Sequence, residues 1–315
     1  MDCTVFSSAF SLLVFPGLLF LGAYGTFAEW VDRILYARMQ NRVGPPIYQP
    51  VADFIKLMAK EVIIPEAADK GLFRVLPVVA VASVCTAMLM VPAWGPAGVV
   101  SFQGDLVAVL YLLTIPTATF FLAGWCSSSP YATVGSVRAL TQLFAYEVPL
   151  FLSVVGPAIL AGSLSVADIA AAFTANPLFI AVNLPGLAIA LLALQGKLER
   201  VPFDIPHAET EVVGGPFTEY SGGLLALFLL ATDMEMVVGA ALLSAVFLGG
   251  SLALPGALGF VAFLAKTLGI VFVLSLTRAL MARIRIEQMI GLCWKVLAPV
   301  ALLQIIADIL IKKVI

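Results

Sequence analysis

The residues best suited to chemistry lie in one short stretch, 197–222, which reads KLERVPFDIPHAETEVVGGPFTEYSG. Two prolines in it prevent a long helix, and apolar residues alternate with its charges. Carboxylates packed in this way are partly desolvated and repel one another. Both effects raise the pKa toward the range in which a carboxyl group can pass protons. The candidate proton carriers of the stretch are Glu199, Asp204, His207, Glu209, Glu211 and Glu219.

The same stretch also fits a second interpretation, a structural loop in which Lys197 and Arg200 neutralise some of the acids. The residue types alone leave both interpretations open. His207 is the only histidine of the chain. It titrates near a pH of about 6.5 when its surroundings are neutral, so it would be a natural member of a proton path.

Charged residues inside hydrophobic segments form a second group of candidates, because ionisable groups within a membrane are costly and are usually functional. Asp233 and Glu235 lie about midway along the segment 222–249, and Lys266 lies midway along 257–278. The two acids are two residues apart and point to different faces of a helix. We therefore expect at most one of them to pair with Lys266.

Three further acids lie near the ends of hydrophobic segments. Glu29 lies near the end of the first segment and Glu147 near the start of the fourth. Asp308 precedes Lys312 by four residues. That spacing predicts a simple ion pair at a helix end.

The composition requires a membrane to hold these residues in place. Hydrophobic residues make up 62% of the 315 positions and charged residues 11%, against roughly 25% charged in soluble domains. Mean hydropathy is +1.07. These values exclude a soluble enzyme, a secreted disulfide scaffold and a disordered chain. The net charge of −2 leaves no basic surplus to bind nucleic acid, and the four scattered cysteines form no metal-binding motif.

The hydropathy pattern predicts an all-α polytopic membrane protein, a single membrane domain over 1–315 with about eight transmembrane helices. Lys and Arg gather in the loops after the odd-numbered segments. Both termini are therefore expected outside and the long loops on the cytoplasmic side. The predicted segments are 8–28, 73–93, 103–124, 144–164, 178–196, 222–249, 257–278 and 290–312.

The first cytoplasmic loop contains an amphipathic pattern. Apolar residues recur at helical spacing and charged residues take the other faces, which predicts a helix lying on the membrane surface. The apolar positions are Val51, Phe54, Ile55, Met58 and Val62.

Three stretches carry a family resemblance that extends over essentially the whole chain. ERVPFDIPHAETEVVGGPFTEYSGG resembles the ER-x-PFD-x-x-x-x-E-x-E-x-x-x-G-x-x-x-EYSG loop of the heel subunit of respiratory complex I. EWVDRILYARMQNRVGPPIYQPVADFIKLMAKEVIIPEAADKGLF resembles the first cytoplasmic loop of that family. GWCSSSPYATVGSVRALTQLFAYEVPL resembles its G-W-x-S-x-x-x-Y-A-x-x-G-x-x-R…YE segment. The family includes the matching subunit of membrane-bound, energy-converting NiFe hydrogenases.

This resemblance implies a subunit that joins a peripheral redox arm to ion-pumping membrane subunits, without redox chemistry of its own. It implies no cofactor in this chain, with a NiFe centre and iron–sulfur clusters in the partners. Those partners would be hydrogenase-like large and small subunits, an iron–sulfur subunit and antiporter-like membrane subunits, in the cytoplasmic membrane of a prokaryote. Carried over by motif, the proton path comprises Glu29, Glu147, Glu199, Asp204, Glu209, Glu211 and Glu219, with Arg138 and Arg200 as cationic partners.

The first loop departs from the complex I pattern in its length. The complex I pattern in the first loop resembles R-x-GP-N-x-x-GP-x-G-x-LQP-x-AD, whereas NRVGPPIYQPVAD is several residues shorter. The shorter form is more similar to the hydrogenase branch and the related sulfur-reducing complexes, which need no quinone. Two alternatives stay open: a quinone-site subunit of an NADH- or ferredoxin-quinone oxidoreductase, and a purely structural membrane anchor.

Overall fold

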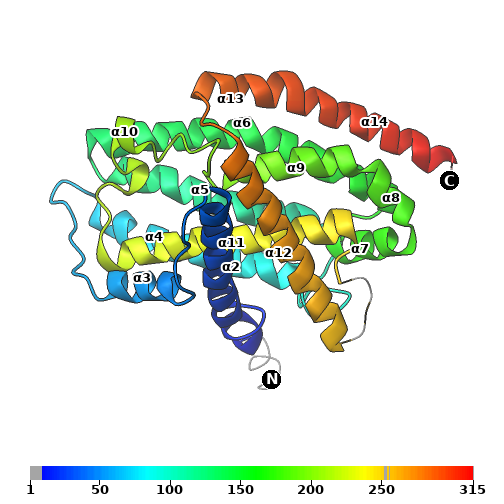
Figure 1. Ribbon diagram of the computed structural model, residues 1–315, viewed down its shortest axis with the longest axis horizontal. Helices are drawn as coiled ribbons and strands as arrows, with labels where there is room; N and C mark the ends of the chain where they lie inside the picture. The colour runs from blue at the N-terminus through cyan, green and yellow to red at the C-terminus, as the bar shows by residue number, and fades with distance from the viewer. Residues whose placement is uncertain (1–8, 252–253, 255, 315) are drawn as a thin grey trace.

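The computed structural model describes residues 9–251, 254 and 256–314 (Figure 1). Within them every regular element is helical, as the sequence predicts. The elements are α2 (Leu18–Met39), α3 (Gln49–Met58), α4 (Lys70–Met90), α5 (Asp105–Cys126), α6 (Pro130–Ala161), α7 (Val166–Ala175), α8 (Pro177–Val182), α9 (Leu184–Lys197), α10 (Glu209–Val212), η1 (Gly215–Phe217), α11 (Gly222–Leu248), α12 (Gly256–Leu280), α13 (Ile286–Leu292), η2 (Cys293–Leu297) and α14 (Ala298–Val314).

Seven helical stretches of the described residues are long and apolar enough to cross a membrane. This confirms the polytopic membrane fold. The stretches are Ala9–Met39, Lys70–Met90, Asp105–Cys126, Pro130–Ala161, Gly222–Leu248, Gly256–Leu280 and Ile286–Lys313.

The predicted segment 178–196 differs, because it is divided into α8 and α9 at Asn183. Pro185 has no backbone N–H to continue the helical ladder back to Ala181. The Asn183 side chain donates to the carbonyl of Phe179 at 3.1 Å, which stabilises the end of α8. The result is two short helices in place of one long one.

The predicted segment 144–164 also differs, since α6 begins at Pro130 and is 32 residues long. Proline is well suited to the first turn of a helix because its missing N–H would be unpaired there. This extension places Arg138 on α6. One side of α6 packs against the 197–222 segment.

Most of the long helices lie along a common axis, parallel or antiparallel to one another. In Figure 1 α4, α5, α6, α9, α11 and α14 run along the long axis, and α2 and α12 cross them steeply. Every residue of α11 from Met234 to Phe247 is buried, as expected for a helix that is apolar on all sides. One end of the molecule carries α3 and α10, and the other carries α7 and α8 (Figure 1). That the α3 end faces the cytoplasm remains a prediction.

The amphipathic pattern of the first loop forms α3. Val51, Ile55 and Met58 are exposed on it, and Asp53 turns toward Arg33 of α2. The helix ends at Met58, so Val62 lies beyond it. An exposed apolar face at this position fits a helix lying on a membrane surface.

Candidate functional site

The 197–222 segment is folded onto the bundle. Phe203 and Ile205 are buried, and Gly215 has a positive φ of 58°, which glycine adopts without strain. A side chain on Gly135 of α6 would collide with the Gly215 backbone, at 2.6 Å from its Cα. Two glycines thus allow α6 and the segment to touch, which aligns Arg138 with the acids of the segment.

Arg200 is the centre of the largest charge cluster. Its two terminal guanidinium nitrogens donate to Glu29 at 2.5 Å and to Asp32 at 2.7 Å. Asp32 also accepts from Arg278 at 2.7 Å and from the hydroxyl of Ser275 at 2.5 Å. Burial alone would lower the pKa of Arg200, but the carboxylates of Asp32 and Glu29 outweigh burial and raise it. The guanidinium is therefore permanently charged.

This Arg200 cluster continues toward α3. Arg33 donates to Glu29 at 2.7 Å and to Asp53 at 3.0 Å. Asp233 of α11 lines a small cavity of about 40 Å³ together with Arg33 and Asp53. The structure thus brings Glu29, Arg200 and Asp233 into one neighbourhood, although they lie far apart in the sequence.

Glu235 belongs to a separate, deeper pair. Its carboxylate lies 3.3 Å from the ammonium of Lys197, and both side chains are at most 1% exposed. The ammonium lies 5.5 Å from the centre of the Tyr146 ring, a distance that allows cation–π attraction. Glu147 follows Tyr146 on α6 and is half-buried. Lys197 and Glu235 form a buried ion pair with few other polar contacts.

Lys266 pairs with neither Asp233 nor Glu235, so the buried pair that the sequence allowed does not form. Its ammonium donates to the carbonyls of Leu248 at 2.5 Å and Gly250 at 2.8 Å. The last carbonyls of a helix lack partners within the helix, and a lysine can satisfy them. Lys266 therefore stabilises the end of α11, whereas Asp233 and Glu235 lie 15 and 13 residues before Leu248 in the same helix.

His207 and Glu199 form a third pair, with Nε2 and Oε2 2.6 Å apart. Burial alone would lower the pKa of His207, but the Glu199 carboxylate outweighs burial and raises it. Burial raises the pKa of Asp204, against the opposing charges of His207 and Arg283. The raised pKa of Asp204 is the direction expected of a carboxyl group packed among apolar residues.

Glu211 differs from that prediction. It is exposed, and Arg138 donates to it at 2.5 Å. This hydrogen bond and the charge of Arg138 lower the pKa of Glu211, so its carboxylate favours the charged form. Glu219 is half-buried. The side chain of Glu209 lies outside the described residues.

Some residues of the site were not among the predicted site residues. Asp32 is fully paired within the Arg200 cluster. It follows Glu29 by three residues, which places both acids on one helix face, and that spacing was an available signal. Arg278 gave no local signal, because only the tertiary structure brings it to this cluster. Among the described residues no group of three or more His, Cys, Asp or Glu side chains could hold a metal ion.

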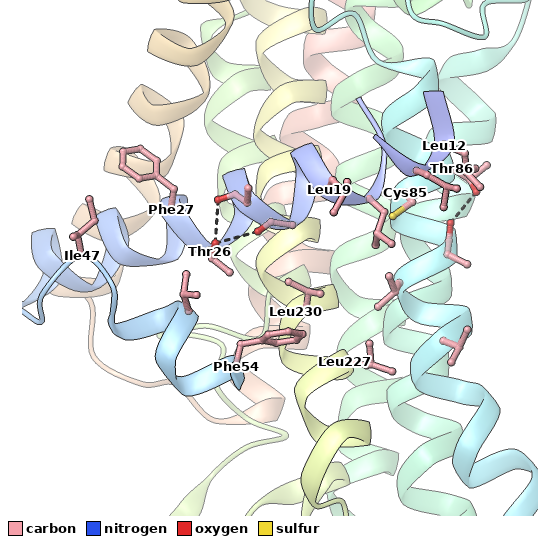
Figure 2. A pocket seen from close by; sticks show the side chains of 18 residues that line it. Leu12, Leu19, Thr26, Phe27, Ile47, Phe54, Cys85, Thr86, Leu227 and Leu230 are labelled. Carbon is pink, nitrogen blue, oxygen red and sulfur yellow. Dashed lines mark hydrogen bonds between the residues drawn. The ribbon is translucent and has the colours of Figure 1, made fainter. Parts of the chain in front are cut away.

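An apolar groove of about 1010 Å³ lies between α2, α3, α4 and α11. Figure 2 shows Leu19, Thr26 and Phe27 on one side of it and Phe54 and Leu230 nearby. The rest of its lining is also almost entirely apolar: Leu12, Leu13, Leu18, Gly22, Ala23, Ile47, Val51, Val78, Val81, Ala82, Cys85, Thr86 and Leu227. Such a lining accommodates a hydrocarbon chain or a lipophilic ring.

The fold and these charge clusters define a multi-pass membrane protein with networks of paired acids and bases near one end of the bundle. A family model described as NADH dehydrogenase matches residues 11–309. The chain belongs to this family.

Curated relatives and a solved structure agree with this assignment. The chain is 37% identical over 298 residues to the H subunit of the NADH-quinone oxidoreductase of Brevibacillus brevis, covering 89% of this chain and 86% of that one. It is 38% identical over 309 residues to the H 2 subunit of the NADH-quinone oxidoreductase of Geobacter sulfurreducens, covering 93% and 92%. A chain of the membrane-bound sulfane sulfur reductase, an archaeal respiratory membrane complex, superimposes with a TM-score of 0.84 at 27% identity, covering 92% of this chain and 96% of that chain.

Proposed function

We propose that this chain is the membrane subunit that docks the peripheral redox arm of a complex-I-like energy-converting complex. It couples electron transfer in that arm to translocation of protons or sodium ions. Its partners are hydrogenase-like large and small subunits, an iron–sulfur subunit and antiporter-like membrane subunits, in the cytoplasmic membrane of a prokaryote. The NiFe centre and the iron–sulfur clusters belong to those partners. The names of the relatives and the structural likeness support this assignment to a respiratory complex.

The observation that carries the proposal is a set of three acid–base pairs of increasing burial, each with a residue of the 197–222 segment. The Glu211–Arg138 pair is partly exposed, the His207–Glu199 pair is more buried, and the Lys197–Glu235 pair is fully buried. Charged groups in apolar surroundings interact strongly. A charge change in a docked redox arm would therefore alter the proton affinity of the outer pair and, through it, that of the inner pair.

The short first loop favours the hydrogenase-type branch and its sulfur-reducing relatives. The indole N–H of Trp30 donates to the carbonyl of Pro45 at 3.1 Å, and Gly44 packs closely against Ile34. The loop is thus folded back onto α2. A loop held in this way leaves little chain to build a wall around a quinone head group.

A quinone-site subunit is the second candidate, and the apolar groove favours it. The groove is large enough for a lipophilic ring and tail, and the curated relatives are named for quinone reduction. Replacing Ala23 with Phe would place a ring in the groove and narrow it. We expect this variant to raise the KM for a short-chain quinone if the complex reduces quinone, and to leave ferredoxin-dependent turnover unchanged if it does not.

The central experiment separates coupling from assembly. In the purified, reconstituted complex, Glu235→Gln and Glu147→Gln should reduce ion translocation at least about tenfold, because positioned proton-transfer groups contribute about 10²–10⁴-fold to a rate. Lys197→Met/Glu235→Gln avoids leaving a lone buried charge and should be equally uncoupled. The exposed Glu287 supplies the control Glu287→Gln, which should pump normally.

The same variants test the structural-anchor alternative. An anchor predicts that each substitution lowers the amount of assembled complex and leaves translocation per assembled complex at the wild-type value. That result, with normal pumping in Lys197→Met/Glu235→Gln, would refute the proposed proton path.

A further inference from the structure

Asp308 is a buried acid at the end of the molecule opposite the acidic segment. It lies on α14, where this helix packs against α6 and α9 near α8 (Figure 1). Asp308 is 0% exposed. The predicted pair with Lys312 is wrong, because the Lys312 ammonium donates to the carbonyl of Ile159 at 2.5 Å. Asp308 is therefore an acid within an apolar layer with no cation bound to it among the described residues.

The hydrogen bonds of Asp308 leave one oxygen without a donor. Gln304 donates to its Oδ1 at 3.1 Å and, with the same nitrogen, to the carbonyl of Val182 at 3.0 Å. Oδ2 is buried and accepts from no described residue. An ionised carboxylate in this position would lack the donors that usually compensate for desolvation.

Asn183 presents a second acceptor to the same place. It lies at the break between α8 and α9 and is 1% exposed. Its Nδ2 donates to Phe179, and its Oδ1 accepts from no described residue. A Cβ on Gly156 would collide with Asp308 Oδ2 and would lie 3.3 Å from Asn183 Oδ1. The two orphan oxygens therefore flank one point on α6.

Apart from Lys312 and Lys313, the charged groups of the packed helices lie far along the chain from Asp308 or from its neighbours Gly156 and Asn183. Lys313 is exposed on α14, and Lys295 and Glu287 lie at least thirteen residues earlier in the same stretch of chain. On α6 the nearest acid is Glu147, nine residues before Gly156, or about 13 Å away along the axis at about 1.5 Å per residue. On α9 the only charged group is Lys197, fourteen residues from Asn183.

We propose that Asp308 is a proton-binding site, whose neutral carboxyl group donates its O–H to Oδ1 of Asn183. A single proton on Oδ2 of Asp308 would let that atom donate to Oδ1 of Asn183, so that both unpaired oxygens take part in one hydrogen bond. Deprotonation would create an anion one helical turn from Lys312, whose ammonium can turn from the Ile159 carbonyl toward it. If the proposed translocation function holds, Asp308 is the exchange point between the membrane interior and the far surface.

The test measures the proton directly in the purified complex. A hydrophobic carbodiimide reacts with protonated carboxyl groups in apolar surroundings, and peptide mass spectrometry locates the adduct. We expect labelling of Asp308 that falls as the pH rises and is unaffected by sodium. Infrared spectroscopy should show a protonated-carboxyl band that Asp308→Asn removes. Asp308→Asn keeps the shape and offers an N–H to Asn183, so it should fold.

Matched variants complete the design. Asp168 is exposed at the same end and accepts from Ser163, so it should neither label nor give the band. Lys312→Met should move the pH at half-maximal labelling upward, because a cation that favours the anion is lost, whereas Lys313→Met should not. Absence of both label and band would overturn the proposal. Protection by sodium would overturn it in favour of a sodium site.

These readouts do not depend on pumping. A labelled Asp308 in a complex that moves no ions would leave the proton site standing and refute the proposed coupling function. An unlabelled Asp308 in a complex that pumps normally would refute the proton site and leave the proposed coupling function standing.

Discussion

The Arg200 cluster and the Lys197–Glu235 pair both join carboxylates to cationic side chains, but they differ in how many hydrogen bonds their carboxylates accept. In the cluster all four carboxylate oxygens of Glu29 and Asp32 accept hydrogen bonds. In the pair Glu235 has only the 3.3 Å contact with Lys197, and neither group makes a well-formed hydrogen bond within the described residues. A saturated network fixes its charges and geometry. A sparse pair can exchange a proton or a partner with little rearrangement.

The largest expected effect comes from breaking the cluster. Arg200→Met leaves two carboxylates without their shared cation, and we expect it to lower the free energy of unfolding by about 5 kcal/mol, the upper part of the range for a broken buried pair. Thermal unfolding of the purified complex would measure this. Arg283→Met is the control, because the ion pair of Arg283 is with the exposed Glu211, at 3.5 Å. Equal losses in both variants would contradict a special role for the cluster.

The second prediction concerns a loss of stability that a second substitution reverses. Lys197→Met strands Glu235 and should cost about 3 kcal/mol, whereas Lys197→Met/Glu235→Gln should return to near the wild-type stability because a buried pair is often replaceable by neutral groups. A double-mutant cycle on unfolding gives the coupling energy. Additive losses would mean that the two groups do not interact.

A third prediction concerns pH. The pKa of His207 is raised above its ordinary 6.5 in the folded protein. The protonated pair with Glu199 therefore stabilises fully below pH 6.5, and this stabilisation is lost as the pH rises through the raised folded pKa. The unfolding temperature should fall over that window. His207→Gln and Glu199→Gln should each flatten the profile, and an unchanged profile would exclude the pair as its cause.

The smallest effect on stability is expected at the surface. Glu211→Gln removes an exposed partner of Arg138, and exposed pairs contribute little. The unfolding temperature should stay near the wild-type value. Turnover of the assembled complex should become less sensitive to ionic strength if Glu211 guides docking of the redox arm. A large drop in unfolding temperature would show that this part of the segment belongs to the structural cluster.

Much of the fold follows from local patterns. The apolar segments, the amphipathic helix α3 and the irregular acidic segment depend on composition and spacing over fewer than about thirty residues, and the structure confirms them. The division at Asn183 was missed because the segment 178–196 is strongly apolar on average, and one asparagine and one proline change its mean hydropathy little.

The partners of the charges could not be read from the chain. Sequence placed Asp233, Glu235 and Lys266 at the middle of neighbouring segments, which suggested one buried pair. The structure instead pairs Glu235 with Lys197 from α9 and uses Lys266 at the end of α11, because α12 crosses α11 steeply (Figure 1). Residue types and periodicity determined the membrane fold and the identity of the ionisable groups. Only the crossing of the helices decided which oppositely charged groups meet, because Coulomb attraction and hydrogen bonding act across a few ångströms of space and not along the chain.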